Sequence, residues 1–100
     1  MTNEPEVIPD ADHEQLIERV AAIDVAKEFG KVCVLLPDPA RPGRPISRVW
    51  DTDATTNAVL ALACRLIEMG VQKVTVESTS DYWRIWFYLL ESQGLASALR

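Results

Sequence analysis

The sequence predicts an α/β fold in which three β-strands are followed by helix, strand and helix around one mixed sheet. Short apolar runs of β-type, separated by turn residues, fill the first half, and apolar residues recur at helical spacing in two later segments. The chain of 100 residues is 48% hydrophobic and 25% charged, which is typical of a single globular domain with a modest core.

The first three strands are predicted at residues 20–25, 31–36 and 46–50. Residues 27–30, Lys-Glu-Phe-Gly, have the length and the glycine of a hairpin loop, so the first two strands should be antiparallel. Residues 37–45 contain four prolines, which cannot donate hydrogen bonds to a ladder. This segment is therefore predicted to be an exposed loop, from which the third strand returns.

Two helices are predicted in the second half of the chain, at residues 57–69 and 82–93, and each is followed by a glycine. A strand at 72–77 lies between them. Because a helical crossover precedes this strand, it should lie parallel to a neighbour in the same sheet. Residues 95–100, Leu-Ala-Ser-Ala-Leu-Arg, show little pattern, so the sheet is predicted to be incomplete after the second helix.

Helix 82–93 is apolar over more than half of its circumference. The stripe predicted to face the core consists of Trp83, Trp86, Phe87 and Leu90. A second apolar face carries Tyr82, Ile85 and Leu89. We expect missing sequence or a partner subunit to cover this second face, and we therefore predict a homo-oligomer through helix 82–93.

The negative charge of the chain is concentrated at its N-terminus. Of the formal net charge of −5, residues 1–19 contribute six acids against the single base Arg19, while residues 20–100 balance nine acids with nine bases. Residues 1–18 are predicted to be a disordered acidic leader. Residues 19–100 are predicted to be the folded domain.

The cysteine, histidine and hydropathy patterns exclude several classes of protein. Cys33 and Cys64 have no CxxC spacing and are expected to be buried, reduced thiols. The only histidine is His13, and Ile17 stands where an HExxH zinc motif would need its second histidine. No segment has the length of a membrane span and no signal peptide is visible, so a cytoplasmic location is expected.

Two carboxylates stand in apolar strand runs and are the main candidates for a site. Asp24 lies within the run 20–27, and Glu77 ends the run 73–77. A buried charge is costly unless it is paired or binds a metal, although a strand-end acid satisfied by backbone donors is the alternative. Neighbouring strands are about 4.8 Å apart, so both acids can reach one divalent ion. Hard oxygen ligands suit Mg²⁺ or Mn²⁺ better than Zn²⁺.

The order and motifs of the chain resemble a known family. Three antiparallel strands followed by β-α-β-α are the opening of the ribonuclease H-like fold. The segments Ala22-Ile-Asp-Val-Ala-Lys27, Val74–Arg84 and Leu89–Gly94 closely resemble the N-terminal RuvC-like domain of the DEDD insertion-sequence transposases. These bacterial recombinases are guided, in studied members, by a bridge RNA. The resemblance covers about residues 20–94.

The resemblance implies a Mg²⁺-dependent DNA transposase that cleaves and exchanges strands, with DNA and a guide RNA as partners. The family's first two catalytic and metal-binding acids correspond to Asp24 and Glu77. Its two later aspartates and its catalytic serine have no counterpart here, and the tail 95–100 replaces an apolar fifth strand. Our hypothesis is therefore a truncated or frame-shifted remnant that is inactive alone.

Five basic residues are candidates for contact with nucleic acid. Arg41, Arg44 and Arg48 form the basic cluster of the folded part, on or beside the projecting loop, where a solvated hairpin tip is the alternative. Lys27 lies close to Asp24 in sequence. Arg84 begins the second helix beside the predicted site, where it could contact an anion.

Two other functions remain open. A sugar-kinase or actin-like ATPase fragment also opens with an Ile-Asp strand and a hairpin, but its phosphate loop needs small residues where this chain has Val25–Glu28. A non-catalytic α/β interaction module, which pairs with or interferes with a full-length recombinase, is the third hypothesis. Binding of ATP would favour the first of these, and self-association through helix 82–93 would favour the second.

Overall fold

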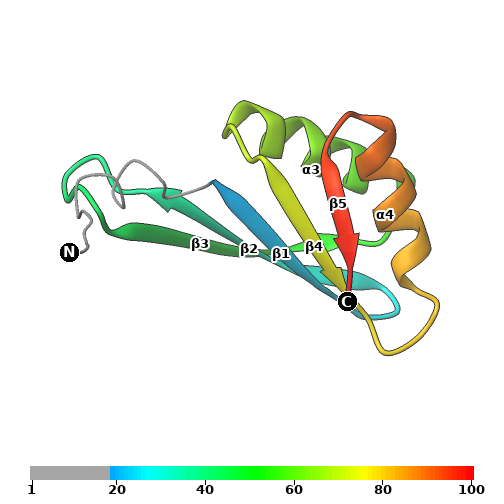
Figure 1. The fold of residues 1–100 in the computed structure, drawn as a ribbon. Helices are drawn as coiled ribbons and strands as arrows, with labels where there is room; N and C mark the ends of the chain where they lie inside the picture. Colours follow the sequence, from blue (N-terminus) through cyan, green and yellow to red (C-terminus); the bar gives the residue numbers. More distant parts are fainter. Residues whose placement is uncertain (1–18) are drawn as a thin grey trace, which may run out of the picture.

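The computed structural model describes residues 19–100, which form one mixed sheet with two helices (Figure 1). The predicted acidic leader, residues 1–18, lies outside the described residues. The elements in chain order are β1 (Val20–Val25), β2 (Phe29–Pro37), β3 (Pro45–Asp53), α3 (Thr56–Glu68), β4 (Lys73–Glu77), α4 (Trp83–Ser92) and β5 (Ala96–Leu99).

The sheet has the strand order β3-β2-β1-β4-β5. β1 runs antiparallel to β2 and parallel to β4, and β3 is antiparallel to β2. The predicted α/β fold with three antiparallel strands followed by a helical crossover is therefore confirmed. None of the helices in the described part of the chain is long and apolar enough to cross a membrane.

The C-terminal residues form a fifth strand, so the prediction of a sheet that is incomplete after the second helix is wrong. β5 pairs parallel to β4, from Lys73 opposite Ala96 to Val76 opposite Leu99. Alanine and serine are poor strand formers, which is why local propensity points away from a strand here. Pairing with β4 and burial of Leu95 override that propensity. The tail thus no longer supports a frame-shifted remnant.

Both helices pack on one face of the sheet (Figure 1). Alternate residues of β1 point to this face, because successive side chains of a strand point to opposite sides. The core that results joins three strands and two helices, and its largest fully buried side chains are Trp86, Ile23, Leu66 and Leu90. The opposite face of the sheet is not covered by any element of residues 19–100.

The residues of α4 that face the core differ in part from those predicted. Trp86 and Leu90 are fully buried, as predicted, and Trp83 packs against the core. Phe87 instead packs edge-to-face on Trp83, with ring centroids 5.8 Å apart, and on exposed Tyr88. The second predicted face is largely covered within the chain itself, because Ile85 and Leu89 pack against the core.

The two cysteines are free, but neither is fully buried. Cys33 is half-buried and lies opposite Ala22 in β1, on the sheet face away from the helices. Cys64 is exposed on α3. The prediction of two buried thiols is therefore wrong, because each side chain falls on the outer side of an amphipathic element.

Gly30 lies inside β2 rather than in the hairpin loop, and the packing requires its missing side chain. A Cβ atom at this position would stand 2.7 Å from Cη2 of Trp86 and 2.9 Å from Cγ2 of Ile23. Real carbon contacts are much longer, near 3.5–4.0 Å. Glycine at this position therefore lets the indole of Trp86 reach the centre of the sheet.

We expect Gly30→Ala to lower the free energy of unfolding by about 1–3 kcal/mol, because the added methyl group overpacks the core. Urea denaturation followed by circular dichroism measures this change. Trp86→Phe provides the matched background, since phenylalanine lacks the indole atoms that meet the new Cβ. A cost of the same size in both backgrounds would contradict the assigned contact.

Candidate functional site

The structure places Asp24 and Glu77 side by side on neighbouring parallel strands. Asp24 of β1 is in register with Glu77 of β4, at the C-terminal end of both strands. Helix α3 makes this possible, since a crossover returns the chain in the same direction as β1. Two acids 53 positions apart in sequence thereby become direct neighbours.

The burial expected for Asp24 is not found. Ile23 and Val25 are buried under the helices, so the alternation of the strand leaves Asp24 exposed on the uncovered face. Within residues 19–100, no donor forms a hydrogen bond with its carboxylate, so the alternative of an acid held by backbone donors is wrong as well. Asp24 lies between Lys31 of β2 and Glu77 of β4, so an opposite charge on one side partly offsets the destabilising like charge on the other.

Arg100 is a member of this site that the sequence did not reveal. Its Nη1 lies 3.7 Å from Oε2 of Glu77, and both side chains are well exposed. β5 fixes its place, because the backbone N–H of Arg100 donates to the carbonyl oxygen of Val76 at 2.9 Å. A loose, exposed ion pair of this kind contributes little to stability. It does place a cation beside the two acids.

A hollow of about 360 Å³ opens beside the acids. It is lined by Asp24, Val25, Glu77, Ser78, Thr79 and Arg100. The loop after β4 is held by Ser78, whose hydroxyl donates to the carbonyl oxygen of Ser80 at 3.0 Å and accepts from its N–H at 3.2 Å. The hollow therefore combines two carboxylates, two hydroxyl-bearing residues and one guanidinium group.

The five predicted nucleic-acid contacts do not gather in one place. Exposed Lys27 lies in the β1–β2 turn, at the same end of the sheet as Asp24. Arg84 is the second residue of α4, seven positions after Glu77 in sequence. Its guanidinium carbon lies 5.0 Å from the centroid of the Trp83 ring.

The arginine cluster of the hairpin lies at the opposite end of the sheet (Figure 1). Arg41 forms an ion pair with Asp38 at 3.2 Å, and Arg44 is exposed in the loop. Arg48 faces the side of the sheet on which the helices pack, since it is in register with buried Val34. Arg41 and Arg44 are thus separated from the acids by most of the length of the hairpin, whereas Arg48 lies in the middle of β3.

The carboxylates of Asp24 and Glu77 can supply two of the ligands that a divalent metal ion needs. No group of three or more His, Cys, Asp or Glu side chains in residues 19–100 is arranged to hold a metal ion. Mg²⁺, however, is commonly bound by one or two carboxylates, with water and substrate phosphate oxygens completing its shell. Asp24 and Glu77 meet that smaller requirement.

In metal-free solution and in a Lys31→Met background, which removes the cation opposite Asp24, we expect Asp24→Asn to raise the free energy of unfolding by about 0.2–1 kcal/mol, because it removes the like-charge pair with Glu77. Urea titrations in the presence of EDTA measure the change. Asp51→Asn in the same background is the matched control, since Asp51 is an exposed acid opposite the same position on the other side of β2 and is not paired with Glu77. A loss of stability in Asp24→Asn would show that the two acids do not repel each other.

Comparison with known proteins identifies the fold. No family model matches the chain, and a search of curated proteins found no significant match. A Ppx/GppA family member from Aquifex aeolicus superposes with a TM-score of 0.55 at 11% identity, over 83% of this chain and 35% of that one. The type II variant of that Ppx/GppA phosphatase gives 0.53 at 11% identity, over 84% and 36%. RuvC from Thermus thermophilus gives 0.55 at 12% identity, over 82% and 63%.

These similarities are at the level of the fold alone, because the identities are so low. The chain spans about a third of each Ppx/GppA chain and 63% of the RuvC chain. The mixed sheet with element order βββαβαβ is therefore the ribonuclease H-like fold, in the form common to RuvC-like and actin-like domains.

Proposed function

We propose that this chain carries the first two metal-binding acids, Asp24 and Glu77, of a DNA transposase or recombinase domain that uses Mg²⁺ or Mn²⁺. The observation that supports the proposal most is the register that opposes these acids on parallel strands. Strands in such a pair are about 4.8 Å apart, so both carboxylates reach one ion. The similarity of the fold to RuvC and the motifs shared with the DEDD transposases point the same way.

A divalent ion bound there would stabilise the charge that develops on phosphate oxygens during strand cleavage. The role of Asp24 and Glu77 is to hold and orient it. Arg100, Ser78 and Thr79 offer a cation and hydroxyl groups on the adjoining wall for a phosphate of the DNA. Two of the family's four acids support little or no cleavage, so we expect this chain to be inactive alone.

The basic residues divide into two groups in this proposal. Lys27 and Arg84 contact the DNA close to the acids. Arg41 and Arg44 lie roughly 25 Å away and Arg48 roughly 14 Å away, judged from the register, the rise per residue and the spacing of the strands. We therefore propose that this second group binds the backbone of a nucleic-acid segment farther from the acids, such as part of a guide RNA.

An actin-like ATPase fragment is the second candidate, because Ppx/GppA proteins share the fold. The β1–β2 turn argues against it. This turn is closed by the N–H of Ala26, which donates to the carbonyl oxygen of Phe29 at 2.8 Å, and it exposes Lys27 and Glu28. Glycine and threonine, the residues that such a phosphate loop typically uses, are absent from positions 25–28. Binding of ATP, measured by calorimetry, would favour this candidate over the recombinase.

A non-catalytic interaction module is the third candidate. The observation that favours it is the ring cluster on α4, in which half-buried Trp83 and Phe87 contact exposed Tyr88. Exposed aromatic rings are enriched at protein interfaces. Self-association through helix 82–93 stays a prediction, now restricted to this ring cluster.

Titration with Mn²⁺ followed by NMR tests the proposed metal site. We expect paramagnetic broadening to centre on Asp24, Glu77 and their neighbours, because both carboxylates approach the ion. Asp24→Asn should abolish this centre of broadening, whereas Asp51→Asn should leave it in place. Broadening confined to residues 1–18, or unchanged in Asp24→Asn, would contradict the proposal.

A further inference from the structure

Two neighbouring hollows lie along the hairpin of β2 and β3, on the face of the sheet where the helices pack. The first, of about 530 Å³, is lined by Arg19 and Arg48 beside apolar Leu36 and Ile46. The register places these residues on the helix side, because Leu36 opposes Ile46 and Arg48 opposes buried Val34. The hairpin projects beyond the helices here, so within residues 19–100 this hollow stays uncovered (Figure 1).

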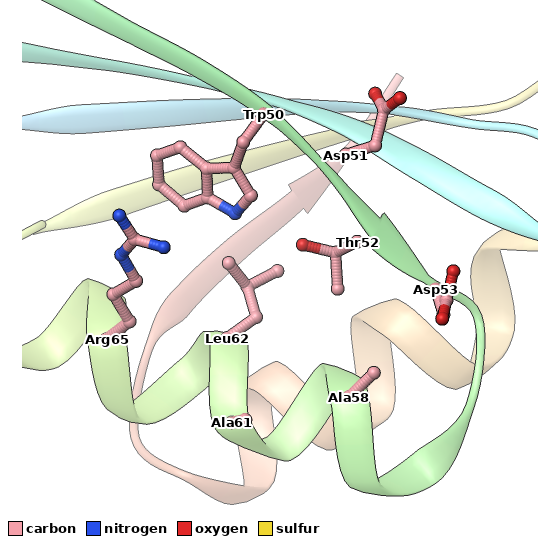
Figure 2. A pocket seen from close by; sticks show the side chains of 8 residues that line it. All are labelled: Trp50, Asp51, Thr52, Asp53, Ala58, Ala61, Leu62 and Arg65. Carbon is pink, nitrogen blue, oxygen red and sulfur yellow. The ribbon is translucent and has the colours of Figure 1, made fainter.

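The second hollow, of about 330 Å³, lies between β3 and α3 (Figure 2). Trp50 and Thr52 form its strand side, and the small residues Ala58 and Ala61 leave room on its helix side. The guanidinium carbon of Arg65 lies 4.2 Å from the centroid of the Trp50 ring. A planar cation stacked on an indole offers a surface on which a nucleobase can stack. The second hollow thus combines space for a flat ring with a surface that favours one.

Arg48 links the two hollows. It stands two positions before Trp50 in β3, and both side chains face the helix side because side chains alternate along a strand. Their Cα atoms are therefore about 7 Å apart. Arg48 is exposed, whereas Trp50 is half-buried. A ligand that has both an anionic group and a flat ring can contact the two residues together.

Three guanidinium groups come together at the hollows, those of Arg19, Arg48 and Arg65. One acid, Asp38, also lines the first hollow. Its carboxylate has partners of its own, because it accepts hydrogen bonds from Nε of Arg41 at 3.2 Å and from the backbone N–H of Ala40 at 2.9 Å. Asp38 therefore does not balance the three arginines, which attract an anion.

Asp51 and Asp53 border the second hollow, but their side chains point to the other face of the sheet. They alternate along β3 with Trp50 and Thr52, which face the helix side. Figure 2 shows Asp51 pointing away from α3. A ligand on the helix side therefore meets arginine and tryptophan rather than these two acids.

We propose that the two hollows bind single-stranded nucleic acid, with a phosphate group on Arg48 and one unpaired base stacked on the pair formed by Trp50 and Arg65. Charge complementarity selects the class of ligand, since three guanidinium groups suit a polyanion. The recessed ring selects a single strand, because the bases of a duplex are stacked on each other and do not enter a hollow. The proposal rests on the proposed function only in taking Arg48 as a contact to nucleic acid.

Fluorescence anisotropy with labelled oligouridine and oligothymidine, each about eight nucleotides long, tests the proposal on the full chain in the presence of EDTA. We expect the two strands to bind with affinities within about threefold of each other, because the contacts use only phosphate and base, which RNA and DNA share. A duplex of the same length should bind about tenfold more weakly, since its bases are not available for stacking.

The salt dependence separates the contribution of charge from that of stacking. With three guanidinium groups on phosphates, the logarithm of affinity should fall with the logarithm of salt at a slope of about −2. Arg48→Gln should reduce this slope by about 0.7. Ala61→Leu narrows the second hollow and removes no charge, so it should lower the affinity about tenfold and leave the slope unchanged.

Lys31→Gln is the matched control for the loss of a charge. Lys31 is an exposed cation of the same hairpin, but it faces the other side of the sheet, opposite Asp24 and Asp51. This variant should keep both the affinity and the slope of the unaltered chain. All variants retain residues 1–18 with their six acids, so that differences between variants come from the substituted side chains.

Arg48 and Ala61 are both exposed, so substitution of either leaves the core intact. Both variants should keep the Mn²⁺ affinity of the unaltered chain, which separates a failure here from a failure of the proposed metal site. The proposal is overturned if either strand fails to bind at about 20 mM salt and about 100 µM protein. It is also overturned if Lys31→Gln weakens binding as much as Arg48→Gln, if Ala61→Leu binds like the unaltered chain, or if an oligoglutamate peptide binds as tightly as the strands.

Discussion

The parallel pairing of β1 with β4 is the constraint on which the rest of the structure depends. A tight turn cannot connect two parallel strands, so the chain must cross over the sheet between the hairpin and β4. Helix α3 forms this crossover. The same pairing makes β1 the central strand, with a hairpin on one side and the second half of the chain on the other. It also aligns the C-terminal ends of β1 and β4, where the two acids stand.

The one-sided packing of the sheet determines what those ends offer. Because both helices cover the same face, the alternation of β1 sends Ile23 into the core and Asp24 to the open side. The acids are therefore accessible to an ion and to a large substrate such as DNA. Their proximity has a cost in stability, which is reduced in part by the long, exposed ion pair with Arg100 and by Lys31 opposite Asp24 on β2. A bound divalent cation would offset the remainder.

Sequence periodicity predicted the strands and helices because each has a strong pattern of its own. The 2-residue alternation in β1 and the helical spacing in α3 are confirmed by the structure, and the ends of the elements differ from the predicted ends by a few residues. β5 was missed because its residues, Ala96–Leu99, are poor strand formers whose pairing comes from β4, which is a long-range effect. Arg100 was missed with it, since only β5 brings this residue to Glu77.

The other differences have the same origin in tertiary contacts. The adjacency of Asp24 and Glu77 could be anticipated from topology, but their exposure could not, because the sequence does not show which face the helices cover. The sequence around Gly30 predicts a hairpin loop, and only the contact with Trp86 explains why β2 has a glycine at this position. Phe87 has core spacing along α4, yet its ring finds Trp83 and Tyr88 instead.

The central claim is that Asp24 and Glu77 act on one ion, and a double-mutant cycle of Mn²⁺ affinity tests it most directly. Calorimetric titration would compare the unaltered chain with Asp24→Asn, Glu77→Gln and the double variant. If both carboxylates hold the same ion, either single substitution should remove most of the binding, and the second should then cost little more. Losses in binding free energy that simply add, or affinity that persists in the double variant, would contradict a shared site.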